Sequence, residues 1–236
     1  MSERFLREEM LLGSAAMERL ARAHVIVFGI GGVGSYAAEG LARAGIGALT
    51  LVDSDTVGES NINRQLCALS STIGQFKSDV MAQRISDINP DCRVTSLPAL
   101  YNEESKERFF TQRYDYIVDA IDLVSCKLSL IQTALERGIP IISAMGTGNK
   151  LDPTQFCITD ISETSGCPLA RIMRRELRAR GIEHHTVLYS KEPAQKPAAT
   201  EAPPPGRRTV PGSVSWVPSC AGLMLAGYVV RRLAEE

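Results

Sequence analysis

The sequence predicts an α/β fold: a doubly wound, mainly parallel sheet with helices on both of its faces. Short β-branched runs, the first at residues 24–28, alternate with longer segments whose apolar residues recur at helical spacing. A glycine-rich turn at residues 29–34 joins that first run directly to a helix. Strands that alternate with helices form parallel sheets, because each crossover helix returns the chain to the edge of the sheet from which it started.

Breaker residues set the ends of the predicted elements. Gly45 and Gly47 end the helix that follows the turn, Asn89-Pro90 stops the next helix, and Gly138 closes the third. Between these helices lie short apolar runs that read as strands. The predicted strands are residues 24–28, 48–52, 93–97, 115–119 and 140–144, and the predicted helices are residues 35–44, 78–89 and 127–137.

The last third of the chain changes in composition. Apolar residues recur at helical spacing from 169 to 177, with arginines mostly on the other faces, which predicts an amphipathic helix. Residues 193–211 hold half of the chain's 12 prolines and predict a mobile loop. Residues 214–230 are mostly apolar but include serines, a proline and glycines, so we expect a buried helix at a subunit interface rather than a membrane span.

The composition limits the classes of function. With 236 residues, 26 basic and 27 acidic side chains, the chain has no overall charge excess that would indicate a nucleic acid or a membrane. Its charged start lacks a signal core and its six cysteines form no C-x-x-C pair, so we expect a cytoplasmic protein with free thiols and no structural zinc. The length fits a single domain, residues 1–236, with a nucleotide-binding core at about 20–150 and a C-terminal elaboration at about 151–236.

The glycine-rich turn predicts a nucleotide site. Its glycines allow a tight turn and let the backbone N–H groups that open the helix face a phosphate. Asp53 follows the next strand, where a carboxylate binds ribose hydroxyls in Rossmann-like folds. By itself this pattern favours a dinucleotide, as in a dehydrogenase, and no P-loop motif is present. The glycines are Gly29, Gly31, Gly32 and Gly34.

The residues after Asp53 indicate phosphoryl chemistry instead. Arg64 and Lys77 offset the charge of a triphosphate, and Asp122 follows a strand end, where it can hold the Mg²⁺ that bridges phosphates. Hydride transfer needs none of these groups. The motifs are Asp53-x-Asp55-x-Val57, Ser60-Asn61-x-x-Arg64-Gln65, Gly74-Gln75-x-Lys77 and Asp119-x-x-Asp122.

In this order, the motifs resemble those of the ubiquitin-activating-enzyme-like adenylyltransferases, a superfamily of the molybdopterin- and thiamine-biosynthesis type. Residues 4–7, Arg-Phe-Leu-Arg, are similar to its N-terminal motif. The resemblance implies ATP-dependent adenylation of a carboxylate by a homodimer in which Arg7 reaches the partner's site. It also implies that Asp53 binds ribose and Asp122 organises Mg²⁺. The resemblance further implies that Asn61, Arg64 and Lys77 contact the phosphates. Asp55 and Gln65 complete the implied set of nucleotide contacts.

Two branches of the superfamily remain as alternatives. One adenylates the C-terminal glycine of a ubiquitin-like sulfur carrier and usually has two C-x-x-C pairs, which this chain lacks. The other comprises the tRNA threonylcarbamoyladenosine dehydratases, which residues 4–13, 145–153, 167–171 and 212–219 resemble. That closer resemblance implies adenylation of the threonyl carboxylate on the adenosine next to the anticodon. Ring closure by the neighbouring carbamoyl group then expels AMP, with no enzyme cysteine required.

A basic region in the last third is a candidate tRNA surface. Cations of the predicted arginine helix can neutralise phosphates, although a solvated helix face with Glu176 paired to an arginine explains them as well. A nucleotide-binding module without catalysis is a third function class, and a sulfur-transfer protein stays open as a further partner. The cations are Arg171, Arg174, Arg175, Arg178, Arg180, Lys191, Lys196, Arg207 and Arg208.

Overall fold

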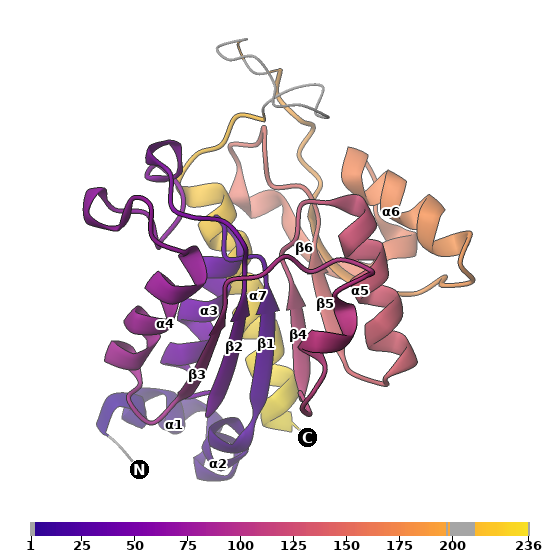
Figure 1. Ribbon diagram of the computed structural model, residues 1–236. Coiled ribbons are helices and arrows are strands. Elements are labelled where there is room, and N and C mark those ends of the chain that lie inside the picture. The colour runs from indigo at the N-terminus through magenta and orange to yellow at the C-terminus, as the bar shows by residue number, and fades with distance from the viewer. Residues whose placement is uncertain (1–2, 197, 199–210, 236) are drawn as a thin grey trace.

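In the residues that this computed structural model describes (3–196, 198 and 211–235), seven strands form one sheet in the order β3-β2-β1-β4-β5-β7-β6 (Figure 1). All neighbours are parallel except β6 and β7, so the predicted doubly wound α/β class is confirmed. The strands are β1 (His24–Phe28), β2 (Ala48–Val52), β3 (Arg93–Leu97), β4 (Tyr116–Asp119), β5 (Ile141–Ala144), β6 (Phe156–Asp160) and β7 (Thr186–Ser190).

Helices cover both faces of this sheet. The α-helices are α1 (Leu6–Leu12), α2 (Ser14–Arg22), α3 (Gly34–Arg43), α4 (Lys77–Ile88), α5 (Val124–Glu136), α6 (Pro168–Arg178) and α7 (Trp216–Glu235). Short 3-10 turns occur at Glu3–Phe5, Glu59–Asn61, Ser70–Thr72, Lys106–Phe109, Pro153–Gln155 and Ile161–Glu163.

Strand β1 shows how the two faces share the core. Val25 and Val27 belong to the cluster that includes side chains of α2, α3, α4 and α7. Ile26 and Phe28 belong to the opposite cluster, built mainly with α5 and α6. Because successive side chains of a strand alternate between faces, a stretch buried on both faces must be apolar, as Val25 to Phe28 are.

The predicted elements are confirmed, with small shifts at their ends. Helix α5 begins at Val124, three residues before the predicted start, since the β-branched and small residues ahead of Lys127 resemble a turn. Strands β6 and β7 and helices α1 and α2 were not predicted. The predicted loop at 193–211 falls largely on residues 197 and 199–210, which lie outside the described residues.

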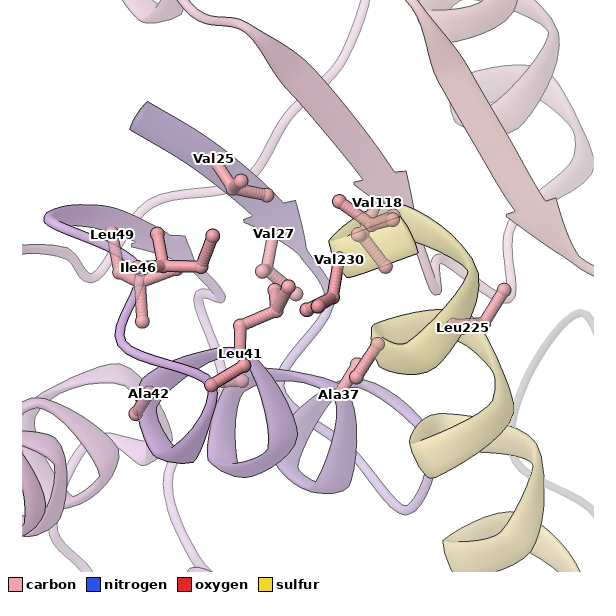
Figure 2. Packing of buried hydrophobic residues seen from close by; sticks show 14 of the residues in the cluster. Val25, Val27, Ala37, Leu41, Ala42, Ile46, Leu49, Val118, Leu225 and Val230 are labelled. Atoms are coloured by element: carbon pink, nitrogen blue, oxygen red, sulfur yellow. The ribbon is translucent and has the colours of Figure 1, made fainter. Parts of the chain in front are cut away.

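Helix α7 confirms the expected buried helix within residues 214–230. It packs beside α3 although the two are far apart in the sequence (Figure 2). Glycines allow the close approach: a Cβ at Gly222 would lie 2.3 Å from the Val33 carbonyl oxygen, and one at Gly40 would lie 2.6 Å from the Ala226 Cβ. In the described part of the chain, no helix is long and apolar enough to cross a membrane.

This packing predicts opposite effects at two glycines of α7. Gly222→Ala forces α7 away from the backbone of α3 and should lower the free energy of unfolding by about 1–3 kcal/mol. A Cβ at Gly227 would have no atom of the described residues within 4 Å. Gly227→Ala should therefore raise that free energy by about 0.5–1 kcal/mol through helix propensity. Urea unfolding of both variants checks this, and equal losses would refute the close-packing account.

Candidate nucleotide-binding site

One cavity lies at the carboxyl ends of the central strands. Its volume is about 840 Å³, and it is lined by the turns that follow β1, β2, β4 and β5 and by the start of α6. Strand order reverses between β1 and β4, because β2 lies on one side of β1 and β4 on the other. Ligands of open α/β sheets bind in the crevice at this reversal.

The glycine turn forms the floor of the cavity by close backbone contact. Gly29 has φ 85°, and a Cβ there would lie 2.6 Å from the Ala120 carbonyl oxygen. Gly29, Gly31 and Gly32 line the cavity. Gly34 does not; a Cβ there would meet the Gly29 carbonyl oxygen at 1.7 Å, so this glycine is required for the turn itself.

Asp53 ties that turn to the end of β2. Its Oδ2 accepts the Ile30 N–H at 2.6 Å and its Oδ1 accepts the Asp55 N–H at 2.8 Å. Burial raises the pKa of the Asp53 carboxyl, while these backbone donors act in the opposite direction. Each carboxylate oxygen keeps a free lone pair, so the group can still accept from hydroxyls of a ligand.

The predicted phosphate-binding side chains line one side of the same cavity. Lys77 is buried, and its Nζ lies 2.8 Å from Oδ2 of the exposed Asp55. Arg64 folds over its own turn, where it donates to the Ser60 carbonyl and to Asn63. Two cations at a cavity wall with a glycine turn provide what a polyphosphate requires.

Asn61 and Gln65 flank these cations. The Oδ1 of Asn61 accepts the Gly58 N–H at 3.1 Å, which leaves its amide N–H₂ for other acceptors. Gln65 is buried, and its Nε2 lies 3.8 Å from the position of a Cβ at Gly31. Both amides line the cavity, and that of Gln65 lies beside the glycine turn.

Two aspartates in the turn after β4 have separate surroundings. Asp119 is fully buried and accepts from Lys127 Nζ at 2.7 Å and from Ser143 Oγ at 2.6 Å. Asp122 is exposed at the cavity and has no hydrogen bond or ion pair with any described residue. Asp119 thus holds the turn, and Asp122 is the carboxylate available to a ligand.

The cavity wall contributed by residues 146–150 was not assigned a role from the sequence. Asn149 has φ 59°; its N–H donates to the Gly212 carbonyl, its Oδ1 accepts the Gly212 N–H, and its carbonyl accepts the Gln195 N–H, each at 2.7 Å. One residue thereby fixes both chain segments that flank residues 197–210. The sequence signal was the stretch 145–153, which carried only a family likeness.

Arg7 lies outside the cavity, whereas Cys167 and three apolar side chains line it. Arg7 lies on α1, exposed and outside the cavity, with no ion pair to a described residue. Cys167 is buried at the cavity wall beside the start of α6. The cavity is also lined by three apolar side chains that the sequence did not single out, Leu100, Tyr101 and Leu123.

The donor set limits which metal the site suits. Among the described residues, no three His, Cys, Asp or Glu side chains cluster in a way that could hold an ion by themselves. Mg²⁺ is usually bound by one or two carboxylates together with substrate phosphates and water. A lone free carboxylate, Asp122, in a cavity with phosphate-binding groups fits that requirement.

The comparisons by family, sequence and structure all point to the same group of proteins. The model of the ThiF family matches residues 5–236. The chain is 44% identical over 245 residues to the tRNA threonylcarbamoyladenosine dehydratase of Bacillus subtilis, covering 100% of this chain and 96% of that protein. A protein of the same name from Escherichia coli is 44% identical over 177 residues, 75% of this chain and 66% of that protein. The crystal structure of E. coli tRNA N6-threonylcarbamoyladenosine dehydratase, TcdA, in complex with ATP has a TM-score of 0.89 and 35% identity over 99% of this chain and 94% of that one.

The buried network beneath the cavity predicts a pH dependence of stability. His185 Nε2 lies 2.8 Å from Ser143 Oγ, and burial lowers the pKa of His185 from 6.5 to about 3. The unfolded chain therefore takes up a proton near pH 6.5 that the folded chain refuses, so stability is full above that pH and falls on acidification. From pH 7 to pH 5, this group should remove about 2 kcal/mol of unfolding free energy.

The measurement is urea unfolding at both pH values for the wild type, His185→Gln and His184→Gln. The difference between wild type and His185→Gln should shrink by that amount at pH 5. The neighbouring His184 is exposed and serves as the control. A pH profile that His185→Gln leaves unchanged would show that the imidazole titrates normally in the fold.

Proposed function

The chain belongs to the ThiF family, and from this premise we propose that it catalyses the ATP-dependent dehydration of threonylcarbamoyladenosine in tRNA. One observation carries the proposal. A likeness to dehydratases of that name extends over the whole chain and coincides with a cavity whose glycine turn, cations and free carboxylate suit ATP. ATP is a substrate of this reaction.

The proposed reaction activates a carboxylate and then closes a ring. The threonyl carboxylate of the modified adenosine attacks the α-phosphorus of ATP, and pyrophosphate leaves. The carbamoyl group of the same side chain then attacks the acyl carbon, AMP leaves, and the nucleoside has lost one water. Because nucleophile and electrophile are on one side chain, their effective concentration is very high, and the protein's task is to position them.

The residues of the cavity would divide this task. Asp53, with Asp55 beside it, would accept hydrogen bonds from the ribose hydroxyls of ATP. The N–H groups that follow Gly29 would face the phosphates. Arg64 and Lys77 would offset the charge that develops on the α-phosphate and on pyrophosphate. For Lys77 this means exchanging its ion pair with Asp55 for a phosphate oxygen. Asn61 and Gln65 would donate amide N–H groups to the phosphates.

Asp122 would hold Mg²⁺, which neutralises phosphate charge when it is bound. The free state of this carboxylate and its position at the cavity support the role. Asp119 and Lys127 would keep the turn in place so that Asp122 faces the nucleotide.

The other half of the cavity would receive the nucleoside. Its wall includes residues 146–150 and 167–169, among them the buried Lys150, whose Nζ donates to the Glu192 carbonyl. A volume of about 840 Å³ lies in the upper part of the range for small-molecule sites, so two substrates side by side are reasonable.

We further propose a homodimer in which Arg7 serves the partner's site. Helix α1 has no buried residue, and it exposes Leu6, Met10 and Leu11 at 55%, 78% and 87%. An apolar helix surface of this kind is characteristic of an interface between subunits. A cytoplasmic location suits a tRNA substrate, and a sulfur-transfer protein as a further partner stays a prediction.

The first test follows the nucleoside. Purified protein, ATP, Mg²⁺ and tRNA bearing threonylcarbamoyladenosine should yield, after digestion, a nucleoside lighter by one water in mass spectrometry. Asp122→Ala and Lys77→Ala should each lower the rate by about 10²–10³, because they remove transition-state charge stabilisation. Asp91→Ala, an exposed aspartate outside the cavity, is the matched control and should keep full activity.

An unchanged nucleoside, from protein that binds ATP, would reject the dehydratase. Pyrophosphate exchange stimulated by a ubiquitin-like sulfur carrier, and not by the modified tRNA, would then support the alternative branch of the superfamily.

The second test asks whether Arg7 acts across the dimer. Arg7→Ala and Asp122→Ala should each be inactive alone. After subunit exchange in equal amounts, a mixed dimer has one complete site, so about a quarter of wild-type activity should return. Arg22→Ala, on the neighbouring helix α2, is the control for the arginine change and should remain active alone. If both variants are inactive alone, no recovery in the mixture would place Arg7 in its own subunit's site. An Arg7→Ala variant that is active alone would place Arg7 outside the reaction.

A further inference from the structure

Helix α6 presents a row of arginines on the side away from the core. Ala170, Met173 and Leu177 are buried against the sheet. At about 100° per residue, Arg171, Arg175 and Arg178 lie within about 60° of one another on the opposite side. All three are exposed. A rise of about 1.5 Å per residue spaces them along about 10 Å of the helix axis.

The ion pairs of α6 leave this row largely free. Arg171 and Arg178 have no ion pair with a described residue. Arg175 shares the single carboxylate of Glu176 with Arg180. Solvent-exposed pairs of this kind contribute little free energy, so a stronger anion readily replaces them.

Arg174 has a different role and does not belong to the row. Its Nη1 donates to the carbonyl and the hydroxyl of Thr164, both at 2.6 Å, and so fixes the segment that leads into α6. The side chains of the three arginines of the row make no hydrogen bond to a described residue outside α6, so they can be changed without disturbing the helix.

The row begins at the cavity. Pro168 and Leu169, at the start of α6, line the cavity wall, and Arg171 follows within one turn. The exposed Lys191 adjoins the same end, because its carbonyl lies 3.8 Å from the position of a Cβ at Gly166. Figure 1 shows α6 beside α5, on the right of the view. The cations therefore extend outward from the part of the site that would receive the nucleoside.

We propose that Arg171, Arg175 and Arg178, with Lys191 at their cavity end, bind the phosphate backbone of the tRNA whose modified nucleoside enters the cavity. The proposal rests on the proposed function for the identity of the RNA. A nucleoside inside a tRNA enters a cavity with its flanking phosphates at the cavity edge, and arginines on a rigid helix at that edge can fix them. On a chain of net charge −1, a local cation row gives binding and orientation without attracting nucleic acid to the whole surface.

The test measures binding of an unmodified tRNA transcript at several salt concentrations, with no catalysis involved. The triple variant Arg171→Gln, Arg175→Gln, Arg178→Gln loses three phosphate contacts. Its slope of log K against log salt should be shallower by about 2, and its affinity at low salt should fall about tenfold or more. Its ATP affinity should match the wild type, which shows that the fold and the nucleotide half are intact.

A matched control removes the same charge at the opposite edge of the sheet. Arg22, Arg93 and Arg113 are exposed and adjoin the amino ends of β1, β3 and β4. Their triple glutamine variant should bind the transcript with the wild-type slope. Should the α6 triple variant lose ATP binding, the single variant Arg178→Glu, at the far end of the row, replaces it. This variant should still bind the transcript more weakly than the wild type, at unchanged ATP affinity.

The outcomes separate this inference from the proposed function. The α6 variant could dehydrate modified tRNA with a wild-type KM and bind the transcript with an unchanged salt slope. That result would reject the role of the arginine row and leave the proposed dehydratase function intact. A salt slope that depends on α6, in a protein that never dehydrates the nucleoside, supports the row and rejects the dehydratase. The inference is also overturned if the wild-type protein does not bind the transcript. It is overturned as well if the α6 arginines are required only for binding an acidic carrier protein.

Discussion

The close contact between two turns is the constraint on which the site depends. Gly29 follows β1 and Ala120 follows β4, and the space between them excludes even a methyl group. This contact is possible because β1 and β4 are neighbours at the point where strand order reverses. It brings the glycine turn and the Asp122 turn to one cavity, although about 90 residues separate them along the chain. The nucleotide half of the site is therefore a consequence of sheet topology.

A buried ion pair supports this arrangement from beneath. Asp119 and Lys127 are both fully buried, and the hydroxyl of Ser143 satisfies a further lone pair of the carboxylate. Such a pair adds little net stability over an apolar replacement, but losing one partner leaves a buried charge, at a cost of about 3–5 kcal/mol. The pair therefore favours one conformation of the turn after β4. In that conformation Asp119 holds the backbone, and Asp122, three residues later, remains free.

The sequence predicted the first three strands at their observed bounds but missed one edge strand and the first helix. Strands β1 and β2 are apolar runs buried on both faces, which leave a clear signal between breaker residues. Strand β3 has no buried residue, and its placement depended on the Asn89-Pro90 break that ends the preceding helix. Strand β6 was missed since Phe156 is its only buried residue, and an edge strand with a half-exposed pattern resembles a loop. Helix α1 was missed for a similar reason, because none of its residues is buried in the chain.

The candidate site divides in the same manner. The residues proposed to bind the nucleotide, such as Lys77 and Asp122, were identified from the sequence because the chemistry of a side chain follows from the residue type alone. The other half depends on backbone geometry, above all the left-handed Asn149, whose N–H and carbonyl hold two distant segments. Hydrogen bonds of main-chain atoms have no sequence signature, so only the structure identifies them.

The character of that second half also agrees with the proposed chemistry. A reaction that uses an enzyme thiolate requires an accessible, activated cysteine, yet the cavity-lining Cys167 is buried. A substrate that carries both nucleophile and electrophile needs no such cysteine. It needs a rigid enclosure that holds one side chain in a reactive conformation and keeps water from the activated acyl group. A wall of residues 146–150 and 167–169, held in place by the hydrogen bonds of Asn149 and Arg174, is suited to that task.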